Sequence, residues 1–305
     1  MPPPAQQSIS FPRHQRLRVI LLSTGQRPQF LNEIRRLRPV IEQYAEIVAE
    51  DFSGQEDVSH AEADLAIVAG GDGSILRAAH QMGQRQVPVI AVNLGKLGFL
   101  ADVSCNELTK ILGELSTGRL QVVEHLMFDC RVIRNGKVEF QQMGLNEIAV
   151  RTGPPFLLMD IHLYVDSELV TTYSGDGLII STPVGSTAYS LSAGGPILRK
   201  DLEAVVITPL SPHTLSMRPV VDSADRVYEM EVVEPHPETS AVVDGRVLCR
   251  LQPHDRVQVT RAPVRFKLVA PPGHSYYGTL REKLKWGGQL RRRNEPDSQP
   301  GFTQE

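Results

Sequence analysis

Long apolar runs, an excess of basic residues and paired cysteines are all missing from this chain, and each absence excludes a class of protein. No apolar stretch approaches the roughly 20 residues that a membrane-spanning helix needs. The formal net charge of −3 gives no support for general binding of nucleic acid. The 3 cysteines show no zinc-site spacing and follow no secretion signal, which favours a reducing compartment. We therefore expect a cytoplasmic protein with neither membrane nor nucleic acid as a partner.

The glycine-rich turn at residues 70–73 also lacks the two common phosphate-binding fingerprints. Its sequence, Gly-Gly-Asp-Gly followed by Ser74, is not Gly-x-Gly-x-x-Gly, and no Gly-Lys-Ser/Thr follows at P-loop spacing. It does lie between a β-branched apolar run and a helix-forming run, which predicts a strand, a tight turn and a helix N-terminus. Glycines there allow φ > 0 and expose backbone N–H groups to an anion. Asp72 inside this turn suggests a proton or metal role, although helix capping alone would also explain it.

Residues 17–118 alternate short apolar strands with helices, which predicts an α/β domain built on a Rossmann-like parallel sheet. The predicted strands are 17–22, 45–49, 64–69 and 87–92, and the predicted helices are 29–44, 73–83 and 106–116. Ligands of such sheets bind beyond the carboxyl ends of the strands. The turn at 70–73 and a second glycine loop at 93–100 both belong to that edge.

Residues 119–274 have a different residue pattern, in which short segments rich in β-branched residues are separated by Asn-Gly, Gly-Pro and Asp-Ser turns. This pattern predicts an all-β sandwich, and Asp244-Gly245 reads as a type I′ hairpin turn within it. The predicted strands include 129–134, 137–142, 160–165, 168–173, 178–182, 227–233, 241–243, 247–251 and 256–260. We expect residues 275–287 to form a C-terminal helix that returns to the α/β domain. The segments 1–16 and 288–305 are expected to be a disordered N-terminus and a loose tail.

In one stretch of the β domain the residue pattern does not predict β structure. After the strand at 178–182, nearly every residue from Gly185 to Gly195 is small or hydroxylated, apart from Tyr189 and Leu191. Small residues let a flat ligand lie on the backbone, hydroxyls can bond ribose and amide groups, and an aromatic ring can stack on a base. A packing role alone is the alternative. Asn146-Glu147, taken in isolation, is an ordinary polar pair at the start of a strand.

Together these motifs resemble the NAD kinase family, in matching order and spacing from about residue 17 to residue 286. Gly-Gly-Asp-Gly is shared with lipid kinases and phosphofructokinases, whereas Thr-Pro-x-Gly-Ser-Thr-Ala-Tyr, at 182–189, is specific to NAD kinases. The resemblance implies transfer of a phosphoryl group from ATP, with a divalent cation such as Mg²⁺, to the adenosine-ribose 2′-hydroxyl of NAD⁺, giving NADP⁺. It also implies a homodimer or homotetramer in which a neighbouring subunit completes the NAD site.

Two other functions remain as alternatives, a non-catalytic dinucleotide-binding regulator and a lipid kinase. Binding alone does not need Asp72, and the chain shows no apolar or basic membrane-binding stretch. The sequence leaves open whether polyphosphate can replace ATP and whether NAD or NADH is preferred.

Carried over position by position, the resemblance makes Asp72 the proton acceptor and assigns no residue to the metal. Asp176 would bind NAD from the adjoining subunit. The residues expected to contact nucleotide are Gly71, Gly73, Arg77, Phe99, Asn146, Glu147, Ser174, Asp176, Ser186, Thr187, Ala188, Tyr189, Ser190, Leu191, Ser192 and Arg246. Four positions depart from the family pattern: Ser74 replaces a common Thr but keeps the hydroxyl, Val184 replaces a usual Thr, Ser174 a frequent basic residue, and Arg246 a usual amide.

Overall fold

The computed structural model describes residues 7–10, 16–24, 28–95, 98–101, 103–115, 119–214, 216–271 and 275–286. It divides into two compact units, Met1–Pro272 and Gly273–Glu305. The smaller unit contains helix α5 (Tyr276–Leu284), and the Ser275 hydroxyl caps its first turn by accepting the N–H of Gly278 at 3.2 Å. The return of this helix to the α/β domain stays a prediction.

The larger unit holds all the remaining elements. Its helices are α1 (Pro28–Tyr44), α2 (Asp72–Met82), α3 (Cys105–Leu115) and α4 (Tyr189–Ser192), with a 3₁₀ turn η1 (Gly185–Thr187). Its strands are β1 (Gln7–Ser10), β2 (Leu17–Ser23), β3 (Ala45–Asp51), β4 (Leu65–Ala69), β5 (Val89–Val92), β6 (Arg119–His125), β7 (Phe128–Arg134), β8 (Lys137–Gly144), β9 (Glu147–Arg151), β10 (Met159–Val165), β11 (Glu168–Gly175), β12 (Gly177–Ser181), β13 (Ala204–Leu210), β14 (Val220–Ser223), β15 (Tyr228–Val232), β16 (Ser240–Val243), β17 (Arg246–Arg250), β18 (Arg256–Arg261) and β19 (Phe266–Val269). No helix in the described ranges is long and apolar enough to cross a membrane.

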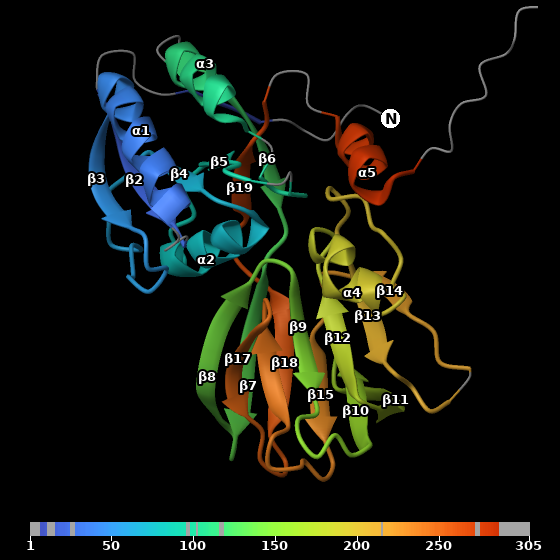
Figure 1. The fold of residues 1–305 in the computed structure, drawn as a ribbon. Helices are drawn as coiled ribbons and strands as arrows, with labels where there is room; N and C mark the ends of the chain where they lie inside the picture. Colours follow the sequence, from blue (N-terminus) through green and yellow to red (C-terminus); the bar gives the residue numbers. More distant parts are fainter. Residues whose placement is uncertain are drawn as a thin grey trace, which may run out of the picture. The chain divides into compact units, whose positions relative to one another are not determined.

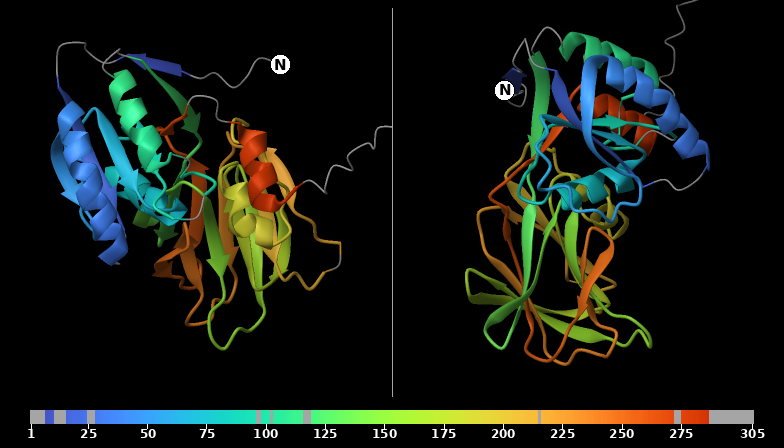
Figure 2. Two further views of the ribbon diagram at one scale, coloured as in Figure 1. Left: turned by 45° about the horizontal axis from the view of Figure 1, so that its top comes forward. Right: turned by 90° about the vertical axis from the view of Figure 1, so that its left-hand side faces the viewer.

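The first sheet has seven strands in the order β1-β6-β19-β5-β4-β2-β3, and β2 to β5 run parallel, as predicted. Alternate residues of these buried strands point to opposite faces. Ile20, Val68 and Ala91 pack with α2, whereas Leu21, Ile67 and Ile90 pack with α1 and α3. The sheet is therefore covered on both faces (Figures 1 and 2). The turn between β4 and α2 lies at the carboxyl edge of the parallel strands.

Two predicted boundaries differ from the structure. β6 and β19 fall inside the segment predicted as sandwich, yet they belong to the seven-stranded sheet. β19 pairs with β5 in parallel and with β6 in antiparallel fashion, and Phe266 is buried in the α2-side core of the α/β domain. Within 1–16, where poor order was predicted, β1 pairs with the edge of β6. Both differences arise from pairing between segments distant in sequence.

The predicted sandwich is confirmed between β7 and β18. One sheet has the order β11-β10-β15-β18-β7-β8 and the other β14-β13-β12-β9-β16-β17. Inward-facing side chains of both sheets form one buried core, which includes Phe128, Ile180 and Tyr228. The hairpin between β16 and β17 turns at Asp244 and Gly245 with φ of 48° and 76°, as a type I′ turn requires.

Candidate active site

The turn that leads into α2 is open on one side. α2 begins at Asp72, after Gly71 with φ −99° and ψ −172°. Only Gly70 of the three glycines takes a positive φ, 155°, so the expectation of general backbone freedom is wrong for the other two. A Cβ on Gly71 or Gly73 would meet nothing within 4 Å. These two glycines therefore leave the backbone accessible at the helix N-terminus, where an anion is favoured.

The carboxylate of Asp72 is held by the loop that follows β5. Oδ2 accepts the N–H of Phe99 at 2.8 Å, and Oδ1 accepts those of Leu100 and Ala101 at 3.0 and 3.2 Å. A Cβ on Gly98 would lie 2.0 Å from Oδ1, so this loop can close on the acid only with glycine there. A carboxylate offers about four acceptor positions. Asp72 is thus fixed in orientation and keeps acceptor capacity for one more donor.

A second carboxylate fixes the Asn146-Glu147 pair. Asp244, whose side chain is fully buried, accepts the backbone N–H of Leu145 at 2.8 Å, of Asn146 at 2.7 Å and of Glu147 at 3.1 Å. The sequence indicated only the hairpin at Asp244. Nothing in the local pattern signals that its side chain holds the start of β9, because the partners lie about 100 residues away.

The segment from Thr182 to Tyr189 encloses the same pair. Thr182 Oγ1 donates to the carbonyl of Leu145 at 2.6 Å, and a Cβ on Gly185 would lie 2.1 Å from the carbonyl oxygen of Asn146. Gly185 therefore permits a direct backbone-to-backbone approach. The backbone of Tyr189 hydrogen-bonds the Glu147 carboxylate. Two motifs that are nearly 40 residues apart in sequence form one site.

Apolar packing joins this site to the Asp72 turn. Ile75 of α2, Leu100, Leu145 and Val184 are members of one buried cluster. Val184, which replaces a usual threonine, is only 2% exposed in this cluster. A threonine hydroxyl at this position would be shielded from water, whereas the valine methyl group packs against apolar neighbours. In addition, Lys200 Nζ donates to the carbonyl of Phe99 at 2.7 Å. The three predicted motifs are therefore neighbours in the fold.

Most hydroxyl groups of the segment from Gly185 to Gly195 already form hydrogen bonds within the protein. Ser186 and Ser190 are fully buried. Ser186 Oγ bonds the carbonyl of Pro183 at 2.6 Å, and Ser190 Oγ lies 2.9 Å from Thr208 Oγ1. Thr187 and Ser192 bond backbone carbonyls at 3.0 and 2.8 Å. These residues shape the segment, in which Ala188, Tyr189, Leu191 and Ala193 are partly exposed and Ser192 and Gly194 are exposed.

Two predicted basic residues meet at the α2 side of the site. Arg77 Nη1 donates to the carbonyl of Gly54 at 3.1 Å. Arg246 follows the Asp244 turn, and partial burial, followed by the positive charge of Arg77, lowers the pKa of its guanidinium. These two positive charges are close enough to repel one another, and an anion beside them would be favoured.

Ser174 and Asp176 lie elsewhere, where the chain crosses from β11 in one sheet to β12 in the other. The Ser174 hydroxyl donates to Asp160. Asp176 is exposed, as predicted for the end of a strand, and a Cβ on Gly175 or Gly177 would lie 2.6 or 2.5 Å from a backbone oxygen. The crossing is therefore tight, and its single acid points outward.

Among the residues that the structure describes, the side chains form no cation site of their own. In the described part of the chain, no group of three or more His, Cys, Asp or Glu residues could hold a metal ion. Magnesium commonly binds through one or two carboxylates and the phosphates of a substrate. The residues present fit a cation that arrives with a nucleotide.

Burial makes the carboxyl group of Glu147 a weaker acid than usual. Loss of solvent, with the negative charge of Asp244 as the second cause, raises its pKa to about 8, and Oε2 has no hydrogen-bond partner. Because the unfolded chain releases this proton near pH 4.5, stability is lost as the pH rises from about 4.5 to about 8.

We expect Glu147→Gln to stabilise the protein at alkaline pH. At pH 8 its free energy of unfolding should exceed that of the wild type by about 2–4 kcal/mol, and at pH 5 by less than about 1 kcal/mol. Urea unfolding at both pH values measures this difference. Glu139→Gln on exposed β8 is the control and should follow the wild type. Equal pH dependence in both variants would contradict the protonated state of Glu147.

Comparisons with known proteins match both halves of the chain. Residues 30–120 match the family model described as ATP-NAD kinase N-terminal domain, and residues 145–270 match ATP-NAD kinase C-terminal domain. The NAD kinase of Rhodopirellula baltica is 50% identical over 273 residues, covering 90% of this chain and 88% of the relative. That of Geobacter sulfurreducens is 39% identical over 259 residues, covering 84% and 90%.

Two solved structures share the fold. Yeast NADH kinase in complex with NADH superposes with a TM-score of 0.82 at 22% identity, covering 96% of this chain and 94% of the other. An NAD kinase from Archaeoglobus fulgidus in complex with ATP has a TM-score of 0.71 at 22% identity, covering 89% and 100%.

Proposed function

The chain belongs to the NAD kinase family, and we propose from this that it phosphorylates the 2′-hydroxyl of the adenosine ribose of NAD⁺ with ATP. In this reaction the ribose oxygen forms a bond to the γ-phosphorus, the bond from that phosphorus to the β,γ-bridging oxygen breaks, and ADP leaves. The hydroxyl proton needs an acceptor, and phosphoryl transfer otherwise depends on positioning and charge neutralisation.

The observation that carries the proposal is the fixed orientation of Asp72. Its carboxylate is held by the N–H groups of residues 99–101 and retains acceptor capacity beside the open backbone of Gly71 and Gly73. A purely structural cap would not need an open face. We assign Asp72 the acceptance of the ribose proton.

The other residues divide between acceptor and donor substrates. Asn146 and Glu147 would hold ribose hydroxyls, with Tyr189 beside them, and Glu147 can donate a hydrogen bond when it is protonated. Tyr189 is partly buried and packs on an apolar cluster that includes Ile179 and Leu210, so only part of its side chain is left for a base. Arg77 and Arg246 would bind phosphate groups. A divalent cation carried by ATP would neutralise the remaining phosphate charge.

An assay of the purified chain with NAD⁺, ATP and magnesium, with NADP⁺ as the measured product, tests this function. We expect turnover with ATP, and a parallel reaction with polyphosphate shows whether the donor can be replaced. Binding of NAD⁺ without product in any donor arm would support a non-catalytic regulator instead. The free thiols Cys105, Cys130 and Cys249 suit the reducing cytoplasm that we propose as its location.

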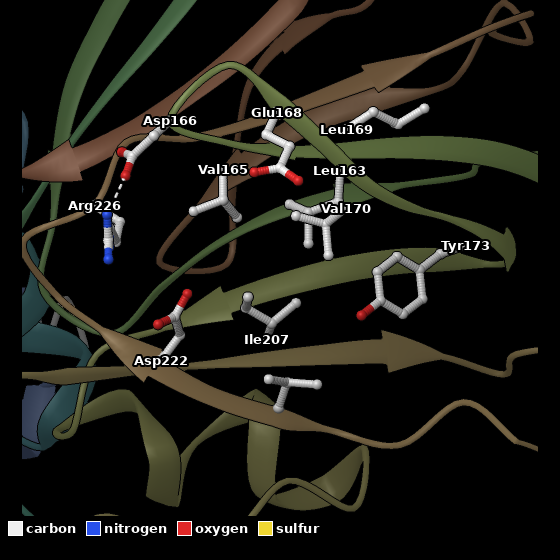
Figure 3. A pocket seen from close by; sticks show the side chains of 11 residues that line it. Leu163, Val165, Asp166, Glu168, Leu169, Val170, Tyr173, Ile207, Asp222 and Arg226 are labelled. Carbon is white, nitrogen blue, oxygen red and sulfur yellow. Dashed lines mark hydrogen bonds and ion pairs between the residues drawn. The ribbon is translucent and has the colours of Figure 1, made fainter.

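We also propose that the active unit is a homo-oligomer formed through the open edge of the sandwich. The edge strands β11 and β14 expose Leu169, Val170, Val220 and Val221, which are 52%, 56%, 46% and 48% exposed. Between these strands lies a pocket of about 540 Å³, and Figure 3 shows Leu163 and Val170 facing Ile207 across it. Apolar edges of this kind are commonly covered by another chain.

Asp176 provides a test of this assembly, because it follows β11 and would reach the NAD of a neighbouring subunit. An Asp176→Ala protein and an Asp72→Asn protein, each weakly active, should regain activity when mixed, since a hybrid interface contains one intact copy of each acid. Native mass spectrometry must first show mixed oligomers. Mixed oligomers with no more activity than the sum of the parents would mean that Asp176 does not act between subunits.

A further inference from the structure

His80 lies at a junction that the proposed chemistry does not use. It is on α2, eight residues after Asp72, and its side chain is 10% exposed. Nε2 lies 2.8 Å from Oδ2 of Asp244, and Nδ1 lies 3.1 Å from the amide nitrogen of Gln142 on β8. The amide nitrogen donates to Nδ1, so the ring proton is on Nε2 and is donated to Asp244.

The same Asp244 carboxylate accepts the backbone N–H groups of Leu145, Asn146 and Glu147. One fully buried acid therefore connects a helix of the α/β domain with the turn of the sandwich that carries Asn146 and Glu147. An α-helix rises 1.5 Å per residue, so Asp72 and His80 are separated by about 12 Å along a single rigid element. The proton acceptor and the ribose-holding pair are tied together through α2, His80 and Asp244.

We propose that His80 and Asp244 are positioning residues, which set the distance from Asp72 to the hydroxyl held by Asn146 and Glu147. This inference rests on the proposed function, because it assigns those residues the same roles. Hydrogen bonds to charged groups are stronger and more directional than neutral ones. The three backbone N–H groups alone would give the Asp244 carboxylate enough hydrogen-bond donors. The imidazole adds a contact that crosses from one domain to the other.

Substitution of His80 separates positioning from binding. In His80→Leu the Asn146-Glu147 turn keeps its three bonds to Asp244, so we expect the KM for NAD⁺ to stay within about threefold. Turnover should fall by about 10- to 100-fold, since a displacement of about 1 Å can cost that much. His80→Gln places an amide donor near the position of Nε2 and should restore kcat to within about threefold of the wild type.

Gln86→Leu is the matched control for stability. Gln86 is buried beside the end of the same helix and donates to the carbonyls of Ala79 and Gly83 at 2.8 and 2.7 Å. Its loss should lower the unfolding temperature without changing kcat. If His80→Leu and Gln86→Leu, at equal unfolding temperatures, lose the same fraction of activity, the contact is only structural and the inference fails.

Asp244→Asn tests the other half of the junction. Asparagine has one acceptor oxygen in place of two, so the turn loosens, and we expect both a higher KM for NAD⁺ and a lower kcat. The double variant with His80→Leu should be no worse than Asp244→Asn alone, since both changes break one connection. Fully additive losses would overturn the connection. If the wild-type protein has no kinase activity, the proposed function is wrong. If Asp244→Asn binds NAD⁺ as tightly as the wild type in calorimetry, this inference is wrong, whatever the outcome for the proposed function.

Discussion

Asp72→Asn is expected to lower turnover by at least about a hundredfold while the affinity for NAD⁺ stays within about threefold, as for loss of a general base. The amide oxygen can still accept the N–H groups of Leu100 and Ala101, so the loop should remain closed. The amide nitrogen, however, cannot accept a proton from the ribose hydroxyl. Single-turnover kinetics and calorimetry with NAD⁺ measure the two effects separately.

Asp51 offers a matched control for this variant. It is the last residue of β3, is buried, and like Asp72 accepts backbone N–H groups, those of Ser53, Gln55 and Glu56. Burial acts to raise its pKa, but the hydrogen bonds from Ser53, Glu56 and Gln81 outweigh burial and lower the pKa to about 2. Asp51→Asn should reduce stability and leave turnover intact. If Asp72→Asn retains near wild-type turnover, Asp72 is a structural cap and the assigned mechanism is wrong.

Gly98→Ala is expected to have an effect of similar size through sterics alone. The new Cβ would lie 2.0 Å from Oδ1 of Asp72, so either the carboxylate rotates away or the loop opens. Overpacking of this kind costs about 1–3 kcal/mol, and the displaced acid should reduce turnover by about a hundredfold or more. Steady-state kinetics together with thermal unfolding measures both consequences.

Gly95→Ala in the same loop is the control, because a Cβ there meets nothing within 4 Å. It should fold and turn over like the wild type. Full activity in Gly98→Ala would show that contact of the loop with Asp72 is not needed in the catalytic state.

The elements that could be predicted from sequence are those whose signals are local. β2, β4 and β5 are short apolar runs with helices between them, and the structure has them within two residues of the predicted bounds. β13 and β14 were not predicted. β13 is buried along nearly its whole length, so no alternation marks it, and β14 has exposed apolar residues on an edge. The placement of β6 and β19 depends on pairing that no local pattern encodes.

In the candidate site, too, the local motifs could be predicted from the sequence and the long-range contacts could not. The Gly-Gly-Asp-Gly turn and the Thr182–Tyr189 segment could be recognised because each is one continuous motif. The connections between them could not, since Asp244 bonds Leu145 about 100 residues away and His80 bonds Asp244 across 164 positions. Such contacts are set by the folded backbone and not by neighbouring residue types.

The position of β19 beside β5 has a consequence for the order of events on the ribosome. Leu268 pairs with Val89, so β5 lacks its neighbour until about 180 further residues have been made. At a synthesis rate of about 5–20 residues per second, this interval lasts about 10 to 35 seconds. During it the apolar strand Val89–Val92 has an unpaired edge, and such edges are prone to aggregate. In the sequence the sandwich strands β7 to β18 lie between β6 and β19. We therefore expect the open edge of β5 to need protection, by transient structure or a chaperone, until β19 has been synthesised.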